Sequence, residues 1–177
     1  MPEFSTYITV AAAHHEWDPE CPIVAAEICR EVQNAVGDRR RVEHVGSSSV
    51  PGMPGKNIID LALEAEPGDV PGFVTALVEI GWQRQTEPWA HPATRPMLYG
   101  AFDRSGRRHL SHLHIVGAAE FESMVRFREA LRADPALRDR YAERKREVLA
   151  SGVTEGHLYA DAKSDVVEAI LDEGERR

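Results

Sequence analysis

The segment VEHVGSSSVPGMPGKNIIDLALEA, residues 42–65, constrains the fold of this chain more than any other part of the sequence. Two short apolar runs typical of β-strands flank a loop rich in glycine, serine and proline, and Asp60 lies in the middle of the second run. A carboxylate inside an apolar strand costs free energy unless it is hydrogen-bonded, paired with a cation or bound to a metal ion. The fold must therefore place Asp60 where such a partner can reach it.

The hydrophobic pattern along the rest of the chain predicts an α+β fold. Apolar residues recur at intervals of three or four in several segments, and the sequence predicts helices over residues 22–36, 71–80, 118–134, 135–150 and 156–171. Alternating runs predict strands over residues 41–45 and 57–63, and MLYGAFD and RHLSHLHIVG flank the turn DRSG as a β-hairpin. The expected architecture is a small mixed sheet covered by helices, mostly on one face, with a helical C-terminal third.

Length and charge limit the classes of function that we expect. The 177 residues suit one domain over residues 1–177, with residues 119–177 as a helical subregion. A net charge of −8 argues against a broad nucleic-acid surface, because such binding needs a dominant basic face, but it permits a small phosphorylated molecule or nucleotide. The apolar stretches are too short to span a bilayer, and the start MPEFSTYITV lacks the basic region of a signal peptide. We therefore expect a cytoplasmic protein without membrane contact.

The loop over residues 46–56 has the composition of a phosphate-binding site, because glycines let backbone N–H groups approach an anion and serines add hydroxyl donors. A Walker A motif is excluded, since Val50 occupies the position of its first glycine and Asn57 the position of its Ser/Thr. A different arrangement fits: Gly–Ser leaves a strand, twelve residues follow, and Asp60 lies in the next strand. In such a site the loop holds a nucleotide triphosphate and the aspartate holds the Mg²⁺ that bridges it, since Mg²⁺ prefers one or two carboxylates with phosphate oxygens and water.

The string VEHVGSSSVPGMPGKNIIDLAL resembles the signature of the GrpB proteins, relatives of the nucleotidyltransferase superfamily whose domain is also found fused to dephospho-CoA kinase. The likeness continues through HLSHLHIVG, FREALRADPALRDRYAERKREV and YADAKSDVVEAIL, so it covers nearly the whole chain from about residue 40. The resemblance implies a nucleotidyltransferase-like fold, in a family whose members mostly lack an assigned substrate.

The resemblance also implies a set of site residues from the loop, two strands and the C-terminal helices. They are His44, Gly46, Ser47, Ser48, Lys56, Asp60, His112, His114, Arg128, Arg132, Lys145, Tyr159 and Lys163. By this resemblance Asp60 is the metal ligand and is catalytic together with His112 and His114. The other residues bind the nucleotide, except that Arg132 matches the family's helix motif without an assigned role. The implied cofactor is Mg²⁺, and an NTP is the substrate or ligand.

A second carboxylate for a two-metal site is missing from the expected position. In the wider superfamily a second acid follows the first by two residues, whereas this chain has Ala62 there. Glu64 shares a face with Asp60, but a rise of ~3.3 Å per residue places it roughly 13 Å away along the strand. Two catalytic ions lie only ~3.5–4 Å apart, so Glu64 cannot serve the same pair. Glu43 on the neighbouring strand, Asp103 in the hairpin turn, or neither remain as the alternatives.

His112 and His114 are two residues apart on a predicted strand, so their side chains are expected on one face, with His109 on the other. Such a pair can share a transition-metal ion or place an imidazole beside a phosphate as a donor or general base. Zinc is disfavoured, since no third ligand has motif spacing. Two functions remain open: Mg²⁺-dependent transfer of a nucleotidyl group from an NTP to an unknown acceptor, or a non-catalytic accessory module that binds a nucleotide or another phosphorylated ligand. Ala62 is the observation that favours the second.

Overall fold

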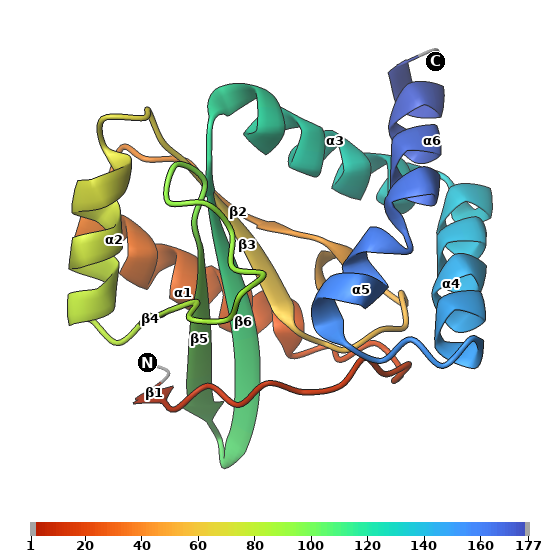
Figure 1. The fold of residues 1–177 in the computed structure, drawn as a ribbon, viewed down its shortest axis with the longest axis horizontal. Helices are drawn as coiled ribbons and strands as arrows, with labels where there is room; N and C mark the ends of the chain where they lie inside the picture. The colour runs from red at the N-terminus through yellow and green to blue at the C-terminus, as the bar shows by residue number, and fades with distance from the viewer. Residues whose placement is uncertain (1–2, 176–177) are drawn as a thin grey trace.

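The computed structural model describes residues 3–175 and has a six-stranded sheet at its centre (Figure 1). Its strands are β1 (Glu3–Ser5), β2 (Val42–Val45), β3 (Ile59–Glu64), β4 (Gln83–Arg84), β5 (Met97–Arg104) and β6 (Arg107–Val116). They lie in the order β1-β5-β6-β3-β2, with β4 paired to β5. Only the β3–β6 pair among these described strands is parallel, so the predicted mixed sheet is confirmed. Residues 1–2 and 176–177 of the predicted domain lie outside the described range.

Six α-helices follow the predicted order over most of the described chain. They are α1 (Cys21–Val36), α2 (Val70–Glu79), α3 (Ala118–Ala133), α4 (Pro135–Ala150), α5 (Gly156–Asp161) and α6 (Ser164–Glu175). The predicted helical C-terminal third is confirmed. A short 3₁₀ helix, η1 (Ser47–Ser49), forms inside the glycine- and serine-rich loop.

The prediction of one helix over residues 156–171 is wrong, because the chain breaks between α5 and α6. The Ser164 hydroxyl donates to the carbonyl of Asp161, and the Asp165 carboxylate accepts from the N–H of Val166. These side chains satisfy backbone groups that a continuous helix would have paired, and they are residue types that favour helix starts. Apolar residues continue at close to helical spacing across the break, so the sequence pattern did not reveal that a new helix begins at Ser164.

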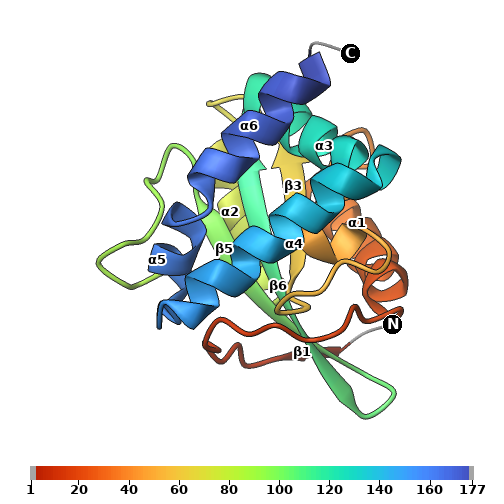
Figure 2. The ribbon, with the colours of Figure 1, turned by 90° about the vertical axis from the view of Figure 1, so that its right-hand side faces the viewer.

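Alternate residues of β3 face different environments. Ile59, Leu61 and Leu63 point to the face covered by α1 and α2, where they form a buried apolar core. Asp60 and Ala62 point to the other face, which α3 covers along the β2–β3 edge. Helices therefore lie on both faces, and the expectation that they cover mostly one face is wrong. Figure 2 shows α4, α5 and α6 in front of the second face.

A proline corner sets the direction of α4. Asp134 ends α3 and caps α4, because its carboxylate accepts a hydrogen bond from the N–H of Ala136 at 2.8 Å. Pro135 occupies the first turn of α4, where its missing N–H is not needed. The predicted break between the two helices is confirmed, and it lets α4 turn across the sheet instead of extending α3.

The described part of the chain, residues 3–175, contains no helix with the length and apolar content needed to cross a bilayer.

Candidate functional site

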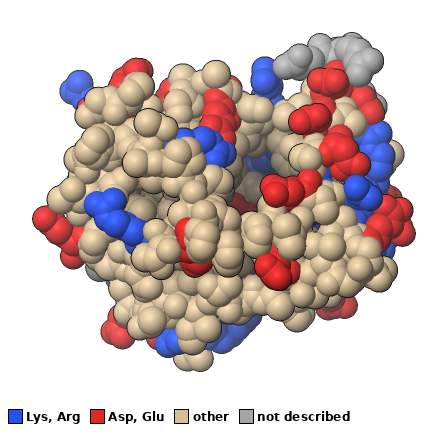
Figure 3. All heavy atoms as spheres, in the orientation of Figure 1, with Lys and Arg blue, Asp and Glu red and all other residues tan. Residues whose placement is uncertain are grey.

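Asp60 lies on the wall of a cavity of about 730 Å³ between the sheet and the C-terminal helices. In the parallel β3–β6 pair, Asp60 is opposite His112 and Ala62 is opposite His114, so these side chains share one face. Asp60 Oδ1 lies 3.4 Å from His112 Nδ1 and 3.9 Å from His114 Nε2. The predicted common face of the two histidines is confirmed. In Figure 3 the surface is hollowed near the middle of the view, with acidic side chains beside the hollow.

The protonation states on this wall follow from burial and hydrogen bonding. Burial raises the pKa of the Asp60 carboxyl, but the adjacent His112 and His114 imidazoles outweigh this effect and hold the pKa well below its ordinary value. Burial lowers the pKa of His112. At neutral pH the wall therefore carries a carboxylate beside a neutral His112 imidazole. The Asp60 side chain keeps 29% of its surface exposed, so a ligand in the cavity can reach it.

Tyr7 completes a chain of hydrogen bonds that the sequence did not suggest. Its hydroxyl lies 2.7 Å from His112 Nε2, and its ring stacks on Tyr99 with centroids 4.3 Å apart. Because His112 Nδ1 faces the Asp60 carboxylate and carries the proton, Nε2 accepts and the Tyr7 hydroxyl donates. Burial raises the pKa of Tyr7 and keeps this hydroxyl protonated. Tyr7 lies after a short edge strand and carries no motif, so no sequence signal pointed to it.

Three lysines gather around two tyrosine rings in the same cavity. Lys163 Nζ lies 4.2 Å from the ring centroid of Tyr159, and Lys56 Nζ lies 5.7 Å from the same centroid. Lys145 Nζ lies 5.0 Å from the ring centroid of Tyr141. These ring faces attract cations, but burial and mutual repulsion make the cluster costly. An anion entering the cavity would relieve that cost.

Burial lowers the pKa of all three lysines. The pKa of Lys145 falls to about 7, first through burial and then through the charge of Lys163. The pKa of Lys163 falls to about 8, and that of Lys56 is also lowered. Lys145 is 1% exposed, and its ammonium donates to the backbone carbonyl of Pro54. The cluster can therefore take up protons when a negatively charged ligand binds.

The loop brings its backbone close to the carboxylate at Gly46. This residue has φ of 66°, and a Cβ there would lie 2.6 Å from Asp60 Oδ2. Only glycine meets both requirements without strain. Asp60 Oδ2 therefore faces the loop while Oδ1 faces the histidines. Ser47 also lines the cavity, and a Cβ at Gly55 would lie 3.3 Å from Lys145 Nζ.

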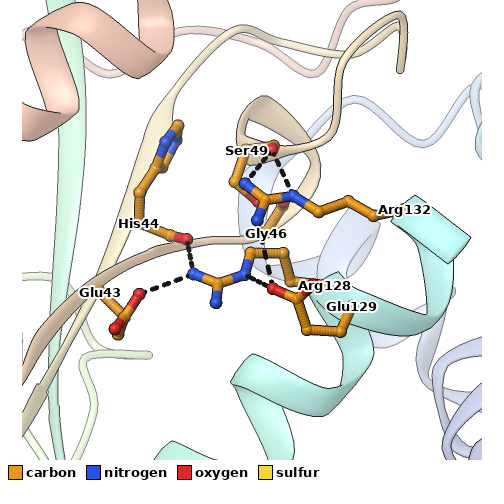
Figure 4. A network of polar contacts seen from close by, with 7 residues as sticks. All are labelled: Glu43, His44, Gly46, Ser49, Arg128, Glu129 and Arg132. Carbon is orange, nitrogen blue, oxygen red and sulfur yellow. Dashed lines mark hydrogen bonds and ion pairs between the residues drawn. The ribbon is translucent and has the colours of Figure 1, made fainter.

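Two arginines from α3 hold the loop from outside the cavity (Figure 4). Arg128 Nη1 donates to the Glu43 carboxylate at 2.8 Å and to the His44 carbonyl at 2.7 Å. Arg132 donates to the Ser49 carbonyl through Nε at 3.1 Å and Nη2 at 2.8 Å. Neither arginine lines the cavity. Both fix the backbone from which the glycine-rich loop leaves β2.

His44 and Ser48 also lie outside the cavity lining. His44 Nε2 lies 2.9 Å from Ser48 Oγ, and Trp17 Nε1 donates to the Ser48 carbonyl at 2.9 Å. Burial lowers the pKa of His44 to about 4, so the imidazole is neutral at physiological pH. The expected site residues thus divide into two groups. The ones that line the cavity are Gly46, Ser47, Lys56, Asp60, His112, His114, Lys145, Tyr159 and Lys163.

The alternatives for a second metal ligand both have other partners. Glu43 pairs with Arg128 at 2.8 Å, and Asp103 pairs with Arg108 at 2.9 Å on the hairpin. Neither lines the cavity. Among residues 3–175, no group of three or more His, Cys, Asp or Glu side chains is arranged to hold a metal ion. Further acids that line the cavity are Glu87, Glu155 and Asp161.

The fold and this cavity define an α+β protein in which Asp60, two strand histidines and three lysines lie around a common space. A family model described as GrpB protein matches residues 8–173. The chain therefore belongs to the GrpB family.

Relatives and solved structures agree with this assignment. A UPF0157 protein of Halalkalibacterium halodurans is 33% identical over 88% of this chain and 78% of its own length. A UPF0157 protein of Streptomyces coelicolor is 32% identical over 80% of this chain and 72% of its own length. The crystal structure of GrpB from Enterococcus faecalis covers 92% of this chain and 96% of its own, with a TM-score of 0.72 at 23% identity, and so has the same fold. The Cid1 poly(U) polymerase covers 74% of this chain and 45% of its own, at 13% identity and a TM-score of 0.45, a partial likeness that assigns no activity.

Proposed function

We propose that this GrpB protein is a Mg²⁺-dependent nucleotidyltransferase that acts from an NTP on a hydroxyl acceptor. The observation that carries the proposal is the convergence of Asp60, the Gly46–Ser47 turn and three lysines on one cavity. A triphosphate needs several cationic and N–H donors within reach of one carboxylate-bound metal ion. Over the described residues, this cavity offers such a set.

The donor set fits one Mg²⁺ ion bound together with a nucleotide. Asp60 would hold it through Oδ2, which faces the loop and is the oxygen not directed at the histidines. Mg²⁺ is commonly held by one or two carboxylates plus phosphate oxygens and water. When bound, the ion supplies charge neutralisation to the phosphates. A two-metal arrangement does not fit, since Ala62 stands where a second carboxylate would lie and Glu43 pairs with Arg128.

The remaining residues have separate tasks in this proposal. Lys56, Lys145 and Lys163 bind the phosphates and stabilise negative charge on the departing pyrophosphate. The acceptor oxygen forms a bond to the α-phosphorus while the bond from that phosphorus to the bridging oxygen breaks. The acceptor proton passes to the Tyr7 oxygen, and the Tyr7 proton passes to His112 Nε2 along the observed 2.7 Å contact.

A thermal-shift panel with each NTP, with and without Mg²⁺, tests the proposed site. A ligand at 100 times its Kd stabilises the folded form by about 2.7 kcal/mol, which is readily measured. We expect Asp60→Asn to lose the part of the shift that depends on Mg²⁺. Asp103→Asn is the matched control, because Asp103 is paired on the hairpin away from the cavity. Equal shifts in the wild type and Asp60→Asn would contradict the proposal.

A second candidate function is nucleotide binding without transfer. The observation that favours it is Ala62, which leaves Asp60 without a second strand carboxylate. Mass spectrometry of wild type and Asp60→Asn, incubated with NTPs and a panel of acceptors, separates the two functions. A labelled product that requires Asp60 excludes the binding module, whereas saturable binding with no product across the panel supports it.

A further inference from the structure

Two stacked rings border the same cavity. Trp89, in the segment between β4 and β5, stacks on His157 of α5, with ring centroids 4.3 Å apart and planes at 13°. Both residues line the cavity. Trp89 remains 50% exposed, although a tryptophan side chain is among the largest apolar surfaces that a protein buries. One ring of the pair is therefore available for a ligand.

Most of the exposed large apolar side chains belong to segments that line this cavity. Six large apolar side chains are exposed within the described residues, and they are Ile8, Val10, Ile23, Val78, Trp89 and Leu158. Val10 and Trp89 line the cavity, and Ile8 and Leu158 are each next in sequence to lining residues. Only Ile23 and Val78 lie on the outer helices α1 and α2. Clustering of this kind marks a binding surface more often than single exposed residues do.

The ring pair lies close to the lysine cluster because both use α5. His157 and Tyr159 are two residues apart on this helix, which corresponds to roughly 3 Å along a helix axis. The ammonium groups of Lys163 and Lys56 lie near the ring face of Tyr159. The cavity thus has cations at one part of its wall and flat rings at another, and α5 contributes to both. The ligand that matches both parts is a polyanion with an attached aromatic ring system.

We propose that Trp89, with His157 behind it, is the platform on which the base of the bound nucleotide stacks. This inference rests on the proposed function, because the phosphates are taken to lie at the lysines. Stacking on an aromatic side chain uses the π-face that every base shares, so the platform selects nucleotides over free polyphosphate and discriminates little between bases.

Calorimetric titration with Mg·ATP and with Mg·tripolyphosphate tests the platform on the full-length protein. Base–aromatic stacking lost on alanine substitution weakens binding by roughly 5- to 150-fold. We expect Trp89→Ala to lower the affinity for Mg·ATP by such a factor, down to that for Mg·tripolyphosphate, and to leave tripolyphosphate binding unchanged. Trp89→Phe, which keeps a ring, should retain part of the difference. Ile23→Ala is the matched control, because this side chain is equally exposed and lies outside the cavity lining.

The outcomes separate the platform from the phosphate site. Equal affinities of the wild type for ATP and tripolyphosphate, or an unchanged ATP affinity in Trp89→Ala, would overturn the platform and leave the phosphate site standing. An equal loss for both ligands in Trp89→Ala, absent in Ile23→Ala, would mean that Trp89 only supports the structure, which also overturns it. Binding of neither ligand by the wild type would overturn the proposed function, and the platform with it.

Discussion

The two faces of β3 differ sharply although they are built from alternate residues of one strand. Leu61 and Leu63 are fully buried beneath α1 and α2 in a continuous apolar core. Asp60, between Ile59 and Leu61, faces a cavity lined by histidines, lysines and a glycine-rich turn. The first face gains stability by excluding water. The second face gathers charged groups whose burial has a cost, which is the pattern expected where stability is given up for binding.

The largest expected effect comes from removing bulk on the apolar face. Leu61→Ala should lower the free energy of unfolding by about 2–5 kcal/mol, because it leaves a cavity in a fully packed core. Met97→Ala is the counterpart on the other face, where this side chain already borders the cavity, and should cost less than about 1 kcal/mol. Urea denaturation measures both. Similar losses in the two variants would remove the contrast between the faces.

A pH dependence should follow from Lys145 on the cavity face. Its pKa is lowered to about 7 in the folded protein, from an ordinary value near 10.5, so between these values the unfolded chain binds more protons. Stability should therefore rise with pH, by up to about 1.4 kcal/mol per pH unit for this group. Lys163, with a pKa of about 8, acts in the same direction. Burial raises the pKa of both cysteines to about 12, which opposes the trend only above pH 9.

Urea unfolding at pH 7, 8 and 9 measures this rise. Lys145→Met should make it shallower, since one of the two titrating amines is gone. Arg140→Met, a change at an exposed cation of the same helix, should leave it intact. A wild-type stability that is flat or falls from pH 7 to 9 would show that Lys145 is an ordinary lysine and that the cavity face carries no such cost.

Gly46→Ala tests the close approach of loop and strand. The substitution combines a positive φ with a contact of 2.6 Å to Asp60 Oδ2, and it should lower the free energy of unfolding by about 1–3 kcal/mol. Gly52→Ala is matched, because Gly52 has φ of 77° but no atom within 4 Å of its added Cβ. Only Gly46→Ala should also weaken nucleotide binding in calorimetry. If both variants lost the same stability and bound nucleotide as the wild type does, backbone strain alone would explain the result. The close contact with Asp60 would then have no effect.

The smallest expected effect is that of Tyr7→Phe. The variant keeps the stack on Tyr99 but removes the hydrogen bond to His112, which should cost about 0.5–1.5 kcal/mol. Because the lost donor favoured the neutral imidazole, the pKa of His112 should rise, as followed by NMR titration. Tyr99→Phe, which loses the hydroxyl bonded to Gln85 and Glu87 but keeps the ring, should leave that pKa close to the wild-type value. An unchanged His112 pKa in Tyr7→Phe would contradict the assigned direction of the bond.

The part of the site that lies on strands could be read from the sequence. His112 and His114 share a face because side chains alternate along a strand, and this periodicity is local. That Asp60 lies on the same face depends on the register between β3 and β6. The strands β2 and β3, the β5–β6 hairpin and most helices were also predictable from local periodicity, whereas the short strands β1 and β4 were not predicted. The break before Ser164 was missed because a short helix and its successor continued one apolar stripe.

The residues that the sequence could not place depend on contacts between distant segments. Tyr7 reaches His112 because backbone hydrogen bonds hold the N-terminal segment in place. These bonds join Ala12 to Thr154 and His15 to Gly55. Trp89 meets His157 because an irregular segment approaches α5. No residue pattern encodes such approaches. The opposite holds for Arg128 and Arg132. The family motif predicted them as site residues, but they bond to the loop backbone outside the cavity.

The parallel β3–β6 pair has a consequence for how the chain acquires its site. Ser111, which donates to the carbonyl of Ile59 across this pair, lies 52 residues further along the chain. Closing so long a loop costs entropy before any contact repays it, so this pairing should come late in folding. During synthesis the glycine-rich turn can form beside Asp60 well before the histidines have been added. A nascent chain would then expose an anion-attracting turn whose acid has no imidazole neighbours, and ligand capture would have to wait for the C-terminal helices that bring Lys145 and Lys163.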